Sequence, residues 1–345
     1  MKKFLISLLL SIPLLVSCSN EPKENLVIYN WGEYMNEDII KDFEKETGIN
    51  VTYAEYDSNE NMYSKVKSNS GEYDIAIPSD YMIERMIKED MLEKINFENI
   101  PNMKNIDKNL IDMSKNFDKE NSYSIPYSFG TLGIVYNSKE VKESIDSFEA
   151  IFDKEYSGQI LMIDSVRDAF TCALKLQGNS LNETNDNNIK NALELLKKQK
   201  PLVQAYANDQ IRDKMISGEA KLGVYFSGDS SYMIKENSDL KYVVPKEGTN
   251  LWIDSIVILK GSKNKENAEK FINYLLDKEV AYKNYKEILI ATPNVEAKEL
   301  LDNDGLVDEI LYPSKEVMNK CEVYKYLGQE VDEIYNTAWF DLRGE

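Results

Sequence analysis

The sequence contains no histidine, and this absence removes the most common designs for catalysis and metal binding. The chain has 345 residues, with no His and only three Cys. Without an imidazole, neither a Ser-His-Asp nor a Cys-His nucleophile can form, and a histidine-ligated metal is excluded. Carboxylate and lysine chemistry remain possible. Three cysteines, Cys18, Cys172 and Cys321, are too few for a disulfide framework.

Positive charge is scarce relative to negative charge. Lys and Arg total 41, Asp and Glu total 60, and the formal net charge is −19. Such a field repels nucleic acid and favours cations, so we expect no nucleic-acid partner. The 42% hydrophobic and 29% charged content is typical of a soluble chain. Its length predicts two domains or lobes.

The N-terminus has the features of a secretory signal. Lys2 and Lys3 precede an apolar run that ends at Val16, which is too short to span a bilayer as a mature helix. Leu15-Val16-Ser17-Cys18 then resembles a bacterial lipobox. We therefore expect a signal peptide over 1–17, lipidation of Cys18 and a tether over 18–25. The alternative is a plain signal peptide with an incidental cysteine.

The secretory signal and the lipobox predict that the folded body lies outside the cytoplasm. The lipid would anchor it to the cell membrane, at the outer face of the membrane or in a periplasm. Cys172 and Cys321 can pair in such an oxidising setting. We favour two free, buried thiols.

Strand and helix patterns alternate from Leu26 onward. Residues 26–29, 51–56 and 74–77 are typical of strands, and helices are expected after Asn36 and over 60–67. This βαβαβ order predicts a parallel sheet covered by helices. The pattern recurs later in expected helices at 189–196 and 268–275 and expected strands at 133–136, 222–226 and 255–259. The sequence therefore predicts two α/β lobes with the chain crossing between them.

Aromatic and acidic residues follow the predicted strands. Aromatic and acidic residues occur together in 30–34 and 78–81, acidic residues occur in 164–168 and 227–230, and 251–254, with both kinds, opens a further strand. In open α/β sheets, ligands bind at the carboxyl ends of strands. Aromatic faces attract an ammonium group by about 0.5–2 kcal/mol each, and carboxylates accept charge-assisted hydrogen bonds worth about 1.5–3 kcal/mol each. This chemistry fits a slender organic cation.

A set of short stretches, in order from Leu26 to the C-terminus, carries a family resemblance. They are 29–34, 43–49, 73–79, 124–127, Asn137, 245–248, 252–255, 264–266 and 292–294. In these stretches the chain resembles the spermidine/putrescine-binding proteins, the substrate-binding lipoproteins of bacterial polyamine ABC importers. The resemblance implies a type II periplasmic-binding-protein fold, in which two lobes joined by a hinge close on a ligand cleft. We expect lobe 1 to comprise 26–132 plus 256–300, and lobe 2 to comprise 133–255 plus 301–345.

The resemblance also implies ten polyamine-binding residues. In the first lobe, Trp31 and Tyr34 match aromatics that flank the polyamine chain. Ser79 and Tyr81 match a second ligand loop. Glu33 lies where the family can offer a carboxylate.

The other five matched positions lie further along the chain. Asp168 matches a glutamate that binds an ammonium end, and Trp252 and Asp254 match an aromatic wall and a central acidic anchor. Asp229 matches the acidic loop of putrescine-preferring relatives. Phe226 lies where the family usually has tryptophan, so it keeps an aromatic face but lacks the N–H donor.

Other departures leave the choice between a diamine and a triamine open. Gly32 replaces a hydroxyl residue, and Ser165 takes a position that is aspartate in the spermidine type. Ile290-Ala291 lies where a tyrosine is often found, so one wall of the aromatic cage is missing or comes from elsewhere.

Six of the ten candidate residues also have a purely structural interpretation. These interpretations are core packing for Trp31 and Trp252, a turn or helix cap for Asp229, an ion pair of Asp168 with Arg167, helix covering for Tyr81 and rim exposure for Glu33.

The sequence predicts a binding protein that performs no bond chemistry and uses no cofactor or metal. Its expected partners are a polyamine, a membrane permease with a cytoplasmic ATPase, and the membrane through the lipid anchor. The alternatives are a binding protein of the same fold for another organic cation, an amino acid, a sugar or carboxylate-bound Ca²⁺, and an enzyme with paired carboxylates. No motif supports the enzyme.

Overall fold

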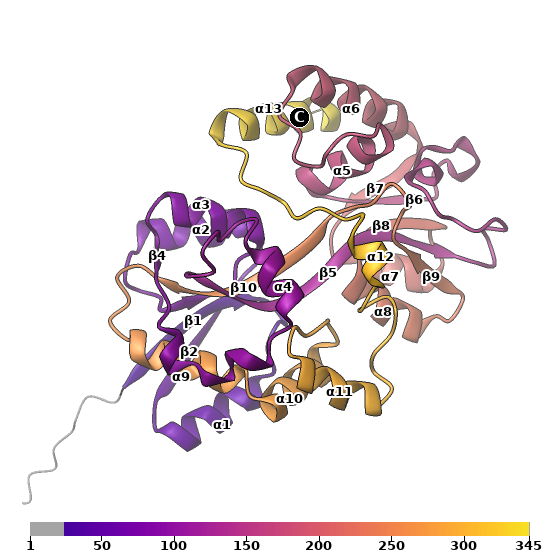
Figure 1. Cartoon of the computed structure of the whole chain (residues 1–345). Helices are drawn as coiled ribbons and strands as arrows, with labels where there is room; N and C mark the ends of the chain where they lie inside the picture. The colour runs from indigo at the N-terminus through magenta and orange to yellow at the C-terminus, as the bar shows by residue number, and fades with distance from the viewer. Residues whose placement is uncertain (1–23, 345) are drawn as a thin grey trace, which may run out of the picture.

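The computed structural model describes residues 24–344, which fold into two α/β lobes (Figure 1). A ten-stranded sheet runs through both lobes of this described part in the order β2-β1-β3-β10-β5-β8-β6-β7, while β4 pairs with β10 and β9 pairs with β5. The strands are β1 (Asn25–Trp31), β2 (Asn50–Tyr56), β3 (Ile75–Ala76), β4 (Leu92–Glu93), β5 (Ser124–Asn137), β6 (Ile160–Ile163), β7 (Val203–Ala207), β8 (Leu222–Phe226), β9 (Leu240–Val243) and β10 (Leu251–Leu259).

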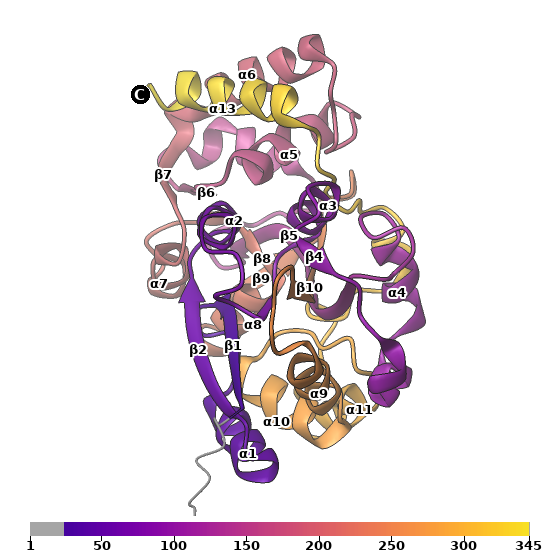
Figure 2. The same cartoon turned by 90° about the vertical axis from the view of Figure 1, so that its left-hand side faces the viewer.

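Helices cover this sheet in both lobes (Figures 1 and 2). The α-helices are α1 (Glu37–Thr47), α2 (Asn59–Ser68), α3 (Asp80–Lys88), α4 (Lys108–Ser114), α5 (Val166–Leu176), α6 (Asp186–Gln199), α7 (Gln210–Ser217), α8 (Ser227–Glu236), α9 (Lys265–Leu275), α10 (Lys278–Ile288), α11 (Val295–Asn303), α12 (Lys315–Met318) and α13 (Gln329–Arg343). The short 3-10 helices are η1 (Phe97–Asn99), η2 (Pro101–Asn105), η3 (Phe148–Phe152), η4 (Lys154–Tyr156) and η5 (Lys200–Leu202).

The predicted βαβαβ unit at the start of the body is confirmed. Strand β1 pairs in parallel with both β2 and β3. Helix α1 begins after Asn36, whose side chain accepts a backbone N–H of the first turn, and ends at Gly48 with φ 76°. This left-handed conformation is one that glycine adopts without steric cost. The predicted apolar face, Ile39, Ile40 and Phe43, is buried.

Two long strands cross between the lobes. β5 and β10 pair antiparallel, β10 also pairs with β3 in the first lobe, and β5 also pairs with β8 in the second lobe. All fourteen residues of β5 are buried. Since each lobe shares a strand with this central pair, the sheet itself forms the connection between them.

The hydrophobic cores differ in part from the expected lobe boundaries. The second-lobe cluster contains β6, β8, α5 and α6 and is closed by α13, which packs on α5 and α6 (Figure 2). By contrast, the first-lobe clusters contain four residues from the ranges 133–255 and 301–345, which the expectation assigned to lobe 2. These residues are Ile253, Leu301, Leu311 and Val323. An apolar residue is expected to be buried wherever it lies in the chain, but its neighbours in sequence do not specify the lobe against which it packs.

Several sequence expectations concern the ends of the chain and the cysteines. The expected signal peptide, Cys18 and most of the tether lie outside the described residues. Cys172 and Cys321 are free thiols, as expected; Cys172 is buried and Cys321 is half-buried. Within residues 24–344, no helix combines the length and apolar character needed to cross a bilayer.

Candidate ligand-binding site

The predicted site residues lie where several strands end and where β10 crosses between the lobes. Trp31 ends β1, Ser79 follows β3, and Phe226 ends β8. Trp252 and Asp254 lie two residues apart on β10 and therefore share one face of that strand. β1 and β3 belong to the first lobe and β8 to the second, so these residues approach the centre of the molecule from both lobes.

Asp254 is a buried carboxylate on the crossing strand. Its side chain belongs to a residue only 7% exposed and accepts a hydrogen bond from the Tyr34 hydroxyl at 2.8 Å. A register shift between Asp254 and Ser255 interrupts the ladder with β5, and such irregularities re-aim side chains. Burial raises the pKa of Asp254 to about 6, against the lowering effect of hydrogen bonds from Ser79 and Tyr34. A cation beside this carboxylate would favour its charged form.

A second buried carboxylate, Asp80, lies beside Asp254 and was not among the predicted site residues. Asp80 is completely buried. Its two carboxylate oxygens accept the backbone N–H of Tyr81 at 2.7 Å and that of Ile253 at 3.4 Å. Burial raises the pKa of Asp80 well above its usual range, and the negative charge of Asp254 raises it further. Two such carboxyl groups can both be ionised only when positive charge is supplied.

Aromatic rings line this region from both lobes. The Trp31 indole nitrogen donates to the Ile77 carbonyl at 2.9 Å, and its ring lies 4.7 Å from that of Tyr56. Phe226 and Trp252 meet edge to face at 6.2 Å between ring centroids. Trp31, Phe226 and Trp252 are half-buried, so each keeps exposed ring surface.

Close backbone approach makes room for the Trp252 ring. The residue opposite it on β5 is Gly130, and a β-carbon there would collide with the indole. The indole nitrogen of Trp252 is buried and has no hydrogen-bond partner among the described residues.

Asn59, which sequence reasoning missed, joins the two predicted residues of the second loop. Its amide nitrogen donates to the Ser79 hydroxyl at 3.1 Å and to the Tyr81 hydroxyl at 3.2 Å. The Tyr81 hydroxyl in turn donates to Glu60 at 2.9 Å. The Tyr81 ring meets the Tyr324 ring edge to face at 6.4 Å. Tyr81 therefore contacts polar partners as well as packing against a neighbouring ring.

Asp168 is held in the second lobe by hydroxyl groups. It is 7% exposed, and it accepts hydrogen bonds from Ser165 at 2.6 Å and from Tyr324 at 3.0 Å. Burial raises its pKa, while these two hydrogen bonds and the charge of Arg167 oppose the rise. The alternative of a direct Arg167–Asp168 ion pair does not describe this geometry, because Arg167 donates to Leu181, Asn182 and Lys325 instead.

Asp229 and Glu33 form the most exposed part of the site. Asp229 lies in the first turn of α8 with a side chain 29% exposed, and the Arg212 guanidinium lies 3.5 Å away. Burial raises the pKa of Asp229 to about 6, with Arg212 lowering it and the charges of Asp209 and Glu33 raising it. Glu33 is exposed at φ 55°. Asp229 makes no side-chain cap of its helix, because the residue at the cap position is Phe226.

The structure links the predicted residues through side chains from both lobes. Direct contacts join Phe226 to Trp252, and the charges of Glu33 and Asp229 influence one another. Tyr324 joins Tyr81 to Asp168. Asp80 lies in the stretch 78–81, which the sequence marked as following a strand, but it was not predicted to bind ligand. Tyr324 lies in a loop that follows no predicted strand, so no sequence pattern pointed to it.

Metal-ligand geometry is a separate question. Among residues 24–344, no three or more His, Cys, Asp or Glu side chains are grouped as metal ligands would be.

Comparisons with known proteins agree with this architecture. Residues 38–308 match the family described as bacterial extracellular solute-binding protein. The chain is 37% identical over 325 residues to the spermidine/putrescine-binding periplasmic protein of Escherichia coli, covering 94% of this chain and 92% of that protein. It is 36% identical over 322 residues to the protein of the same description from Salmonella typhimurium, covering 93% and 92%.

Solved structures give the same picture. A putative spermidine/putrescine ABC transporter protein from Listeria monocytogenes superimposes with a TM-score of 0.86 at 41% identity, covering 93% of this chain and 99% of that one. The spermidine/putrescine transporter substrate-binding protein PotD from Streptococcus pneumoniae, solved in complex with calcium and HEPES, gives 0.84 at 38% identity, covering 93% and 99%. The expected two-lobed fold is confirmed.

Proposed function

The chain belongs to the bacterial extracellular solute-binding proteins, and we propose that it captures a polyamine outside the cytoplasm and delivers it to an ABC importer. The observation that carries this proposal is the pair of buried carboxyl groups, Asp80 and Asp254, beside half-buried aromatic rings. Burial raises the pKa of both groups, so a positive charge placed beside them would favour their ionised forms. An organic ammonium supplies that charge, and its methylenes fit the rings.

Contacts order the acidic residues along the site and support an elongated cation. The charge of Glu33 acts on Asp229, and Asp80, the first residue of α3, lies beside Asp254 of the crossing strand β10. Asp168 follows through the contacts of Tyr81 with Tyr324. Three acidic positions beside aromatic rings fit the three ammonium groups and the methylene chains of spermidine, whereas putrescine would use two of these positions.

Capture then follows from electrostatics and desolvation. The formal charge of −19 attracts a cation toward the open cleft. Closure of the lobes removes water, and a buried ion pair is favourable only when every ammonium proton finds an acceptor. Several carboxylates and hydroxyls are therefore needed around one ligand. We propose binding and release with no bond chemistry.

The membrane arrangement forms a further part of the proposal. We infer that Cys18 carries the lipid that anchors the body at the outer face of the membrane or in a periplasm, and that a permease with a cytoplasmic ATPase receives the ligand. A labelled fatty acid should be incorporated by the wild-type chain and not by Cys18→Ser. Label in both, or in neither, would contradict the anchor.

Titration calorimetry tests the proposed ligand directly. The folded body, residues 24–345, is unfolded and refolded to remove carried ligand and then titrated separately with spermidine, putrescine, lysine, maltose and Ca²⁺. We expect saturable one-to-one binding of spermidine or putrescine, and the ratio of their affinities identifies the preferred polyamine. Binding only of lysine, maltose or Ca²⁺, or of none of them, would overturn the proposal.

A further inference from the structure

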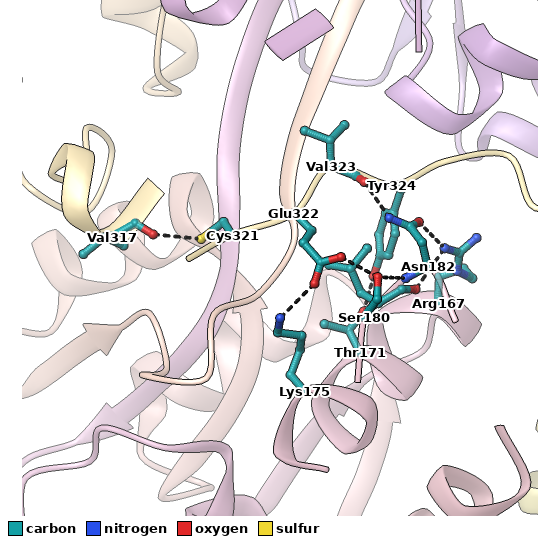
Figure 3. Close-up of polar contacts among 11 residues, drawn as sticks. Arg167, Thr171, Lys175, Ser180, Asn182, Val317, Cys321, Glu322, Val323 and Tyr324 are labelled. Carbon is teal, nitrogen blue, oxygen red and sulfur yellow. Dashed lines mark hydrogen bonds and ion pairs between the residues drawn. The ribbon is translucent and has the colours of Figure 1, made fainter. Parts of the chain in front are cut away.

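A third connection between the lobes, residues 319–328, runs from α12 to α13 and is here called the crossing segment (Figures 1 and 3). Its backbone is tied to the start of β10, because Glu322 donates to the Thr249 carbonyl and accepts from the Leu251 N–H, both at 2.9 Å. Val323 packs in a first-lobe cluster. This part of the crossing segment is therefore attached to the first lobe by main-chain bonds and apolar packing.

Second-lobe side chains attach to the same few residues (Figure 3). Lys175 of α5 forms an ion pair with Glu322 at 2.8 Å, and the Ser180 hydroxyl donates to the other Glu322 oxygen. The Lys175 side chain is only 12% exposed. A pair this poorly solvated adds little net stability, because desolvation offsets the attraction, but it fixes geometry.

Asn182 contacts the backbone of the crossing segment on both sides of Tyr324. Its amide nitrogen donates to the Val323 carbonyl at 2.9 Å, and its amide oxygen accepts the Lys325 N–H at 2.9 Å. One side chain thus uses its donor and its acceptor to fix the two residues that flank Tyr324. Such a two-point contact restrains the direction in which the intervening ring points.

Arg167 completes the restraint by covering the Tyr324 ring. Its guanidinium lies 4.6 Å from the ring centroid and donates to Asn182 at 3.1 Å and to the Leu181 carbonyl at 3.2 Å. The Tyr324 hydroxyl reaches Asp168 at 3.0 Å and lies 2.6 Å from the Thr171 hydroxyl. Arg167, which precedes Asp168 in the chain, therefore contacts Tyr324, and Tyr324 in turn contacts Asp168.

We propose that Asn182, Arg167 and the Lys175–Glu322 pair are positioning residues, which hold Tyr324 against Asp168 and thereby set how strongly this end of the site binds an ammonium group. The inference deepens the proposed function and rests on it for the identity of the ligand. The positioning itself exists in the ligand-free protein, so it can be measured without ligand.

Asn182→Leu is the main test, because it removes the contacts to Val323, Lys325 and Arg167 without changing charge. The matched control is Asn188→Leu, whose amide donates to Glu183 at 2.8 Å in the same region but does not contact the crossing segment. Two quantities are measured: spermidine affinity by calorimetry, and the pKa of Asp168 in ligand-free protein by NMR of ¹³C-labelled aspartate, with the signal assigned by its loss in Asp168→Asn.

We expect Asn182→Leu to weaken spermidine binding about threefold to tenfold, since a hydrogen bond to a charged group is disturbed. The pKa of Asp168 should rise, because the Tyr324 hydrogen bond lowers it. Tyr324→Phe keeps the ring and should raise the same pKa, and adding Asn182→Leu to it should raise the pKa little further. Asn188→Leu should change neither quantity.

A fall in melting temperature with unchanged affinity and unchanged Asp168 pKa would show that Asn182 is merely structural and would overturn the inference. If Asn182→Leu fails to fold, additivity between Lys175→Met and Tyr324→Phe in the Asp168 pKa would overturn it instead. Absence of both spermidine and putrescine binding by the wild type would refute the proposed function, and the ligand-free pKa measurements would still decide the positioning.

Discussion

Asp254 and Asp168 are exposed to the same small extent, but the molecule holds them in different ways. Both residues are 7% exposed, and burial raises the pKa of both. Asp254 lies on a strand whose backbone pairs with Ser128 and Ser79. Asp168 lies on α5, and the side chains of Ser165 and Tyr324 hold its carboxylate.

This difference separates two ways of building an acidic site. The sheet fixes the main chain around Asp254, so most side-chain substitutions nearby leave its position unchanged. The geometry around Asp168 depends instead on Tyr324, which comes from a segment more than 150 residues away in the chain. The region near Asp168 can therefore be altered by substitutions that never touch the ligand.

The largest expected effect is on binding at Asp254. Asp254→Asn should weaken spermidine binding about 100-fold, because a neutral amide loses a charge-assisted bond worth about 3 kcal/mol at most. Asp168→Asn should cost about tenfold, since the positive charge of Arg167 already offsets part of the negative charge of its carboxylate. Titration calorimetry measures both. An equal loss of affinity in the two variants would contradict the expected difference between Asp254 and Asp168. An unchanged affinity of Asp254→Asn would show that Asp254 does not belong to the site.

The same substitution should stabilise the ligand-free protein. Folding raises the Asp254 pKa from 3.8 to about 6, so the folded state binds more protons and loses stability as pH rises between about 4 and 6. Asp254→Asn should therefore raise the free energy of unfolding by about 1–3 kcal/mol at pH 7.5 and leave it nearly unchanged at pH 4. Thermal denaturation gives the comparison.

The matched control for this stability effect is Asp186→Asn in the exposed Lys190 pair. It should change the free energy of unfolding by less than about 1 kcal/mol at either pH. If Asp254→Asn instead destabilised the protein at pH 7.5, the negative charge of Asp254 in the wild type would have to be compensated by the protein itself, without a ligand.

Binding should depend on pH through the same group. At pH 5, a carboxyl group with a pKa of about 6 is mostly protonated, so spermidine should bind about tenfold more weakly than at pH 7.5. Asp254→Asn should remove most of this dependence. Any remainder belongs to the other acidic residues of the site whose pKa values are raised, Asp229, Asp80 and Asp168. A pH-independent wild-type affinity would contradict both assignments.

The smallest expected effect concerns the Tyr34 hydroxyl. Its hydrogen bond lowers the pKa of Asp254, so Tyr34→Phe should move the midpoint of the pH dependence upward by less than about one pH unit. Calorimetry across pH 5–8 measures the midpoint. Tyr53→Phe removes a hydroxyl that accepts from Asn30 and contacts neither Tyr34 nor Asp254, and it serves as control; a shift of the same size in both variants would show that the Tyr34 bond is not the cause.

Much of the first lobe could be predicted because its signals are local. The cap at Asn36, the stop at Gly48 and the buried face of α1 follow from side-chain chemistry within one helix. Trp31 and Ser79 were selected from the family resemblance, in stretches that follow predicted strands, and the structure places Trp31 at the end of β1 and Ser79 after β3. Tyr324 follows no strand and occupies no periodic pattern, so its contact with Asp168 had no local sign.

The sequence by itself determined the βαβαβ start of the body and several later strands and helices, the lack of imidazole chemistry, and the acidic and aromatic side chains at strand ends. Those properties depend on neighbours within a few residues. Only the tertiary structure decided that Asp80 lies beside Asp254, that Arg167 covers Tyr324 instead of pairing with Asp168, and that residues 301–323 pack against the first lobe. Burial and hydrogen bonding between distant segments depend on how the lobes pack, and no local pattern encodes that packing.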